Sequence, residues 1–179
     1  IIVAGARWSD SDDLLAMTPM RDTNLIYNFH FYEPHIFTHQ GATWAVNFWH
    51  YLHGLPYPSD PSNVTAAAQL VPDPVDRLAV VRYGMDRWGS DRIDGEMAQV
   101  AAWASHWKVP VICNEFGVFR LAATPHDRAA WIADTRMALE RHGIGWTMWD
   151  YSGGFGVVTK SGGVATPDPV TLRALGLGS

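Results

Sequence analysis

The feature that most constrains the fold of this chain is a regular alternation of short apolar segments with helical ones. The apolar segments are rich in β-branched and aromatic residues, and a polar or glycine-rich loop follows each of them. They cover Ile1–Trp8, Asn24–Tyr32, Val109–Glu115 and Ile144–Asp150. Continuous apolar runs are typical of parallel strands that are covered on both faces. The alternation therefore predicts a β-α-β-α-β-α-β-α order, with a parallel sheet and right-handed crossovers.

Helix signals lie between and after these segments. The expected helices cover Ser9–Met17, Asp73–Trp88, Arg92–Trp107, Pro125–His142 and a short segment from Asp168 to Leu175. The clearest helix begins at Pro125, because Thr124 is a favourable N-cap and proline suits the first helical position. Gly143 is expected to end this helix. Its apolar stripe consists of Trp131, Ile132, Met137 and Leu139.

The connection between the second and third expected strands is unusually long. It runs from Glu33 to Lys108, and loops of this length are usually functional. Four histidines lie within it, namely His35, His39, His50 and His53. Their spacing matches no metal site, so we interpret them as hydrogen-bonding loop residues and expect no metal.

Composition excludes several classes of protein. The chain has 179 residues, of which 47% are hydrophobic and 17% charged, as expected for one globular domain over residues 1–179. Its net charge is −5 and no run of Lys or Arg stands out, so neither a nucleic acid nor an acidic membrane is an expected partner. The single cysteine, Cys113, permits neither an internal disulfide nor a CxxC metal site. The nine tryptophans indicate either a Trp-rich core or a surface on which sugar rings stack.

The chain begins inside an apolar segment, at Ile1-Ile2-Val3-Ala4. This start has no initial Met and no charged region followed by an apolar stretch, so it does not resemble a signal peptide. We interpret it as a strand whose upstream neighbours are missing or were never there. No apolar run reaches the length of about 18 residues that is typical of a membrane span.

Three motifs together resemble glycoside hydrolase family 5, the cellulase-like retaining glycosidases. They are N-F-H-F-Y-E-P-H-I-F-T-H-Q-G-A-T-W, V-I-C-N-E-F-G-V and I-G-W-T-M-W-D-Y, in the family's order and with plausible spacing. The resemblance runs from Ile1 to about Leu177. It implies a (β/α)8 barrel of which this chain matches the C-terminal half, strands five to eight. The expected fold is therefore α/β, a parallel (β/α)4 half of a TIM-type barrel.

The resemblance also implies roles for individual residues. Glu115 resembles the family nucleophile, His30 and Tyr32 the pair that supports it, and Trp149 the floor of the −1 sugar subsite. Trp8 and Trp44 are further candidates for substrate binding. Each has a plainer alternative: a lone glutamate after a strand is often an N-cap or a surface residue, His30 could be a core histidine, and the tryptophans could be packing residues. The resemblance implies no metal and no organic cofactor.

Reasoning from the residues agrees with these roles. Active sites of such barrels lie at the C-terminal ends of the strands, where Glu115, Tyr32 and Trp149 fall. His30 and Tyr32 are two positions apart on a strand and point to the same side, whereas Glu33 alternates to the other side. A tyrosine hydroxyl that donates to a carboxylate favours the charged form, which a glycosidase nucleophile requires.

The second carboxylate of a retaining site is missing from the expected places. The family's acid/base glutamate lies in an Asn-Glu-Pro motif, which this sequence lacks, and the family's early-strand arginine and asparagine have no counterpart either. The chain has four glutamates, Glu33, Glu96, Glu115 and Glu140. Asp150 of a second copy is a possible substitute, although strand alternation points it away from the side that Trp149 faces.

A half-barrel also leaves two sheet edges and an apolar inner face uncovered. Such surfaces pair with something or aggregate. A complete barrel takes about 250 residues, so we expect a homodimer or larger oligomer, or else a piece of a longer enzyme whose N-terminal half supplies the rest.

Two candidate functions follow from the motifs and from the missing carboxylate. The first is a retaining endoglucanase acting on β-1,4-glucan or a related polysaccharide, secreted as the family usually is. The second is a catalytically impaired, oligomerising half-barrel scaffold with at most weak sugar binding.

Overall fold

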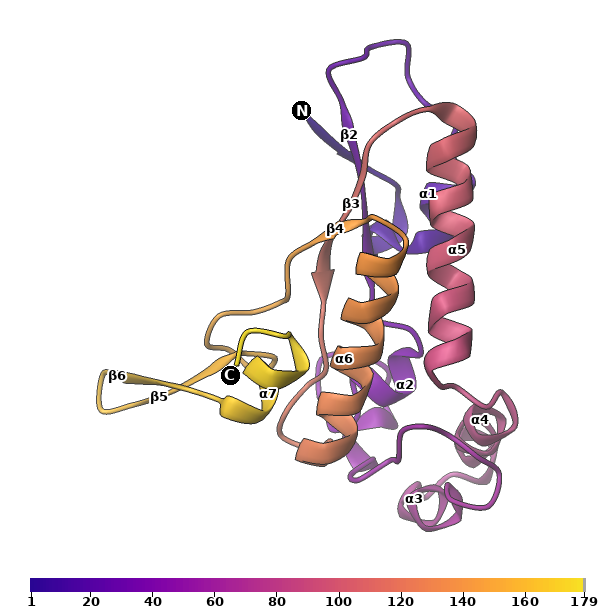
Figure 1. The fold of residues 1–179 in the computed structure, drawn as a ribbon. Helices are drawn as coiled ribbons and strands as arrows, with labels where there is room; N and C mark the ends of the chain where they lie inside the picture. The colour runs from indigo at the N-terminus through magenta and orange to yellow at the C-terminus, as the bar shows by residue number, and fades with distance from the viewer. Residues whose placement is uncertain (179) are drawn as a thin grey trace.

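The computed structural model describes residues 1–178 and contains one four-stranded parallel sheet. Its strands are β1 (Ile2–Ala4), β2 (Ile26–Phe31), β3 (Val111–Phe116) and β4 (Gly145–Trp146), in the order β1-β2-β3-β4. Every neighbouring pair is parallel. The α/β fold with a parallel sheet, predicted from the alternation, is therefore confirmed, and its four strands agree with the half-barrel that the resemblance implied. β2 and β3 point toward the end of the molecule that holds α2, α3 and α4 (Figure 1).

Helices occupy the connections between these strands. They are η1 (Arg7–Ser9), α1 (Ser11–Leu15), α2 (His35–Thr38), η2 (Trp49–Tyr51), α3 (Thr65–Leu70), α4 (Pro74–Met85), α5 (Ser90–Trp107), α6 (Pro125–Arg141) and α7 (Pro169–Ala174). The five helices expected from the sequence are present, with ends that differ by a few residues. The caps are also as expected: the Thr124 side chain accepts a hydrogen bond from the Asp127 backbone N–H, and Pro125 is the first residue of α6.

The structure corrects four details of the sequence reading. β1 ends at Ala4 rather than at Trp8, because η1 follows it with three residues at positive φ. β4 is only two residues long. Met137 does not belong to the buried stripe of α6, since it is 39% exposed. A β-hairpin that was not expected, β5 (Val158–Ser161) with β6 (Val164–Pro167), projects from the fold (Figure 1).

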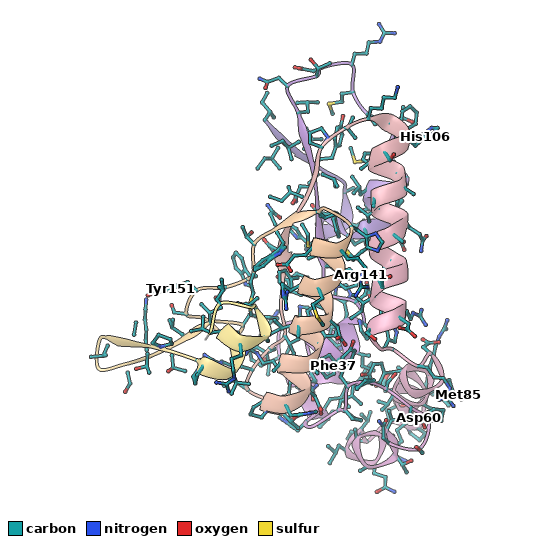
Figure 2. All side chains as sticks on the ribbon, in the orientation of Figure 1. Phe37, Asp60, Met85, His106, Arg141 and Tyr151 are labelled. Carbon is teal, nitrogen blue, oxygen red and sulfur yellow. The ribbon has the colours of Figure 1, made fainter. Side chains whose placement is uncertain are left out.

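The core fills the space between the sheet and the long helices α5 and α6. Alternate residues of β2 point into it: the Tyr27 ring meets Trp103 of α5 edge-on, and the Phe31 ring stacks on Trp131 of α6 with centroids 5.9 Å apart. Phe37, labelled in Figure 2, is also fully buried and packs near Tyr57 and Tyr83. These contacts fix one face of the sheet against the helices.

The opposite face of the sheet is only partly covered. On β2 it carries Ile26, which is 41% exposed, and His30; on β1 it carries the exposed Ile2. This is the face that would line the interior of a closed barrel. Within residues 1–178, no helix is both long and apolar enough to cross a membrane.

Candidate active site

The ends of β2 and β3 bring two predicted residues opposite each other. The pairing of these strands shifts register between Phe29 and His30, so that His30 lies opposite Glu115. Without this shift His30 would pair with Asn114, and Glu115 would point to the opposite face of the sheet. An irregularity in the ladder therefore aligns His30 with the carboxylate.

The carboxylate of Glu115 has two side-chain partners among the residues that the structure describes. The hydroxyl of Tyr32 donates to Oε2 at 3.1 Å, and Nδ1 of His30 lies 3.4 Å from the same oxygen. Both Glu115 and His30 remain partly accessible to solvent. Because both contacts fall on Oε2, they orient the carboxylate while Oε1 carries neither of them.

Tyr32 is held in place from several sides. The hydroxyl of Thr38 donates to its backbone carbonyl at 2.6 Å. The rings of His39 and Phe155 meet its ring edge-on, with centroids 5.2 Å and 5.9 Å away. Burial, and then the nearby Glu115 carboxylate, raise the pKa of Tyr32 well above its usual range. The phenol therefore stays protonated at neutral pH and remains a hydrogen-bond donor.

Two of the loop histidines form a stacked pair beside Tyr32. Nδ1 of His35 lies 2.9 Å from the Glu33 carboxylate, and the His35 ring stacks on His39 and near Trp49. Burial, and then the neighbouring His35, lower the pKa of His39 to about 4. For Glu33, burial works to raise the pKa, but the hydrogen bond and charge of His35 outweigh it and lower the pKa. Within residues 1–178, no group of three or more His, Cys, Asp or Glu side chains is placed so that it could hold a metal ion.

Trp149 lies directly beside the end of β3. Its backbone N–H donates to the carbonyl of Phe116 at 3.0 Å. Its carbonyl oxygen approaches Gly117 so closely that a Cβ on that glycine would lie 2.4 Å from it. The Trp149 side chain is 48% exposed. The loop after β4 thus presents an accessible indole next to the loop that follows Glu115.

The other two tryptophan candidates lie in different surroundings. Trp8 is 91% exposed and sits in η1, after the end of β1. Trp44 is exposed and meets the Phe119 ring edge-on, with centroids 4.8 Å apart. The structure therefore brings Glu115, Tyr32 and His30 into contact and places Trp149 beside the end of the strand that carries Glu115, whereas Trp8 lies in η1 and Trp44 packs on Phe119.

Sequence reasoning missed three residues that shape this site. Thr38 and Phe155 contact Tyr32 directly. Arg128 is buried and donates to backbone carbonyls of the loops after β3 and β4. Thr38 lies in the quoted F-T-H-Q-G stretch, so the motif contained a signal for it. Neither Phe155 nor Arg128 has a local sequence signal that distinguishes it from an ordinary loop or helix residue.

Two hollows of the surface, one of them lined in part by Trp49 and the other by Glu33, do not contain Glu115. One, of about 280 Å³, has apolar and aromatic walls that include Ile36, Trp49 and Trp88. The other, of about 260 Å³, is lined by Asp10, Asp12, Glu33, Arg92 and Glu96 among others. Glu115 instead faces the uncovered side of the sheet, where the concave interior of a barrel would lie.

Comparisons with known proteins agree on one family. The family model "Cellulase (glycosyl hydrolase family 5)" matches residues 1–154. Endoglucanase 3 of Fibrobacter succinogenes is 30% identical over 183 aligned residues, which cover 100% of this chain and 27% of that protein.

Solved structures agree on the fold. A cellulose synthase subunit Z from Clostridioides difficile superposes with a TM-score of 0.72 at 24% identity, over 97% of this chain and 48% of its own. A hyperthermophilic endo-β-1,4-glucanase solved with substrate gives a TM-score of 0.71 at 24% identity, over 98% of this chain and 47% of its own. The chain spans less than half the length of each of these proteins.

Proposed function

The chain belongs to glycosyl hydrolase family 5, and on this premise we propose that it provides the nucleophile half of a retaining glycosidase site. The substrate is a β-1,4-linked glucan or a related polysaccharide. The observation that supports this most directly is the contact of Tyr32 and His30 with one oxygen of Glu115, at the C-terminal ends of two parallel strands. Secretion, which the resemblance implies, belongs to the same proposal.

The proposed chemistry follows from that contact. Oε1 of Glu115 attacks the anomeric carbon, the glycosidic C–O bond breaks, and the leaving oxygen takes a proton from an acid carboxyl group. Water, deprotonated by the same group, then releases the sugar from the covalent intermediate. Tyr32 and His30 hold Oε2 so that Oε1 faces the sugar, and Trp149 stacks against the sugar ring.

The acid carboxyl group comes from outside the set of residues around Glu115. Glu33 is engaged by His35, while Glu96 and Glu140 lie on α5 and α6. Asp150 accepts hydrogen bonds from the Gly153 backbone N–H within its own loop, which argues against it as a substitute acid. We therefore propose that a second half-barrel supplies the acid, either in a second copy of the chain or in the N-terminal half of a longer one.

Two observations favour the second candidate function. The sequence lacks the Asn-Glu-Pro motif, and the inner face of the sheet carries exposed apolar side chains such as Ile2 and Ile26. A chain that closes its barrel with a copy of itself would gain a folded assembly without an acid residue at the usual place. Such an assembly would be a half-barrel scaffold with at most weak sugar binding.

A probe that needs a nucleophile but no acid tests the proposed role of Glu115. In 2,4-dinitrophenyl 2-deoxy-2-fluoro-β-cellobioside the leaving group departs without protonation, and the fluorine slows breakdown of the glycosyl-enzyme. We expect intact-protein mass spectrometry to show one added fluorocellobiosyl group, and peptide mapping to place it on Glu115.

Two variants complete the experiment. Glu115→Gln should take no label, because an amide oxygen is a poor nucleophile. Glu140→Gln, which changes an exposed glutamate on α6, should be labelled like the unchanged chain. Label on another residue, or label that persists in Glu115→Gln, would show that Glu115 is not the nucleophile. Correct labelling without hydrolysis of carboxymethylcellulose would identify a nucleophile that lacks its acid.

A further inference from the structure

Arg128 carries a guanidinium group into the interior beside the candidate site. It lies near the start of α6 and is 4% exposed. Its Nε donates to the Val118 carbonyl at 3.0 Å, and its Nη2 donates to the carbonyls of Phe155 at 2.7 Å and Gly156 at 3.2 Å. A buried cation is unfavourable unless hydrogen bonds and opposite charge compensate it. Three carbonyls from two loops provide much of that compensation here.

The remaining donors of Arg128 face α7. Nη1 donates to the Thr171 hydroxyl and lies 3.6 Å from the Asp168 carboxylate. Burial, followed by the positive charge of Arg120, lowers the pKa of Arg128 to about 10. The guanidinium therefore stays charged at neutral pH and keeps its donors.

The carbonyls that Arg128 binds belong to the two loops that carry the site. Val118 lies in the loop that follows Glu115, and Phe155 lies in the loop that follows Trp149. The Phe155 ring in turn meets Tyr32, whose hydroxyl holds the carboxylate. One side chain thus holds the loop that follows Glu115 to the loop whose Phe155 ring meets Tyr32.

We propose that Arg128 is a positioning residue of the glycosidase site, which aligns Tyr32 and Glu115 by fastening the loops after β3 and β4 to each other. This inference rests on the proposed role of Glu115. Lysine cannot replace arginine in it, because an ammonium group lacks the planar fork that reaches several carbonyls at once. A small displacement of reacting groups can lower a rate by about 100-fold.

The test measures inactivation by 2,4-dinitrophenyl 2-deoxy-2-fluoro-β-cellobioside over a range of concentrations. This separates the first-order rate constant of labelling from the apparent affinity for the probe. We expect Arg128→Lys to keep the far-UV circular dichroism spectrum but to lower the rate constant by about tenfold or more. Arg136→Lys is the matched control. Arg136 lies on the same helix and bonds Glu140 and the Ala174 carbonyl, and its substitution should change nothing.

Chemical rescue separates positioning from general folding stability. Guanidinium ion at tens of millimolar should restore part of the lost rate constant in Arg128→Ala, whereas ammonium ion at equal concentration should not. Should these variants fail to fold, Phe155→Leu keeps the carbonyl that Arg128 binds and removes the ring that meets Tyr32. It should lower the labelling rate constant by severalfold.

The outcomes distinguish the two proposals. Slow labelling of Arg128→Lys with rescue of Arg128→Ala by guanidinium supports the positioning role. Labelling of folded Arg128→Lys at the full rate, or an unchanged rate in Phe155→Leu, overturns that role and leaves Glu115 as the nucleophile. A chain that takes no label before any substitution overturns the role of Glu115, and the role of Arg128 with it.

Discussion

The loop that follows Glu115 and the backbone of Trp149 approach each other closely because Gly117 has no side chain. A Cβ at this position would lie 2.4 Å from the carbonyl oxygen of Trp149, a contact that backbone atoms relieve only by moving apart. The glycine is therefore required by a close approach of two chain segments. The position of the Trp149 indole next to the loop that follows Glu115 depends on it.

We predict that Gly117→Ala destabilises the chain by about 1–3 kcal/mol, as overpacking usually does, and weakens apparent affinity for the fluorocellobioside probe. Urea unfolding and inactivation kinetics measure the two effects. Gly95→Ala is the matched control: Gly95 lies inside α5 with open space around it, so alanine there should stabilise the chain by about 0.5–1 kcal/mol. Equal effects of the two substitutions would contradict the close approach.

At the scale of elements, α6 is central because it carries both Trp131 of the core and Arg128. Its N-cap is Thr124, whose side-chain oxygen accepts from the Asp127 N–H at 3.1 Å. We predict that Thr124→Ala lowers the free energy of unfolding by about 1 kcal/mol, because that N–H loses its partner. Urea denaturation measures the change. Thr124→Ser, which keeps the hydroxyl, should retain most of the stability; a loss equal to that of alanine would mean that the cap contributes little.

The sequence predicted the long elements better than the short ones. β2, β3, α5 and α6 have strong periodicity or clear caps, and all were expected. α2 and α3 have four and six residues, too few for a helical period to appear above chance. The hairpin had a signal, because Gly162-Gly163 at positive φ suits a two-residue turn between strands. Its strands are short and exposed, so no apolar alternation marked them.

The site was predictable where it depends on strand ends. Strand alternation and the three motifs led to Glu115, Tyr32 and His30, and the structure brings them into contact. The register shift that sets His30 opposite Glu115 has no sequence signature of its own. The role of Arg128 depends on carbonyls of two loops far apart in sequence, at Val118 and at Phe155 and Gly156, which only the folded chain brings together.

At the scale of the whole molecule, the partly exposed inner face of the sheet is the surface that a partner would cover. If a second copy covers it, light scattering should give twice the chain mass of 19.9 kDa. Ile26→Glu, which places a charge on that face, should shift the assembly toward monomers, because an ionised carboxylate resists burial. Val75→Glu on the outer surface of α4 should leave the mass unchanged. A monomer for the unchanged chain would instead favour the N-terminal half of a longer chain as the partner.

The open edges β1 and β4 also determine how activity would depend on concentration. A site assembled from two copies turns over substrate only while they are associated, so specific activity falls on dilution, steeply below the dissociation constant of the pair. The proposed nucleophile lies within one chain, so the fraction of chains that can be labelled at Glu115 should fall less steeply. Turnover per chain and label per chain, measured along one dilution series, would therefore diverge. The concentration at which the two curves separate would report how tightly the two half-barrels associate along their open edges.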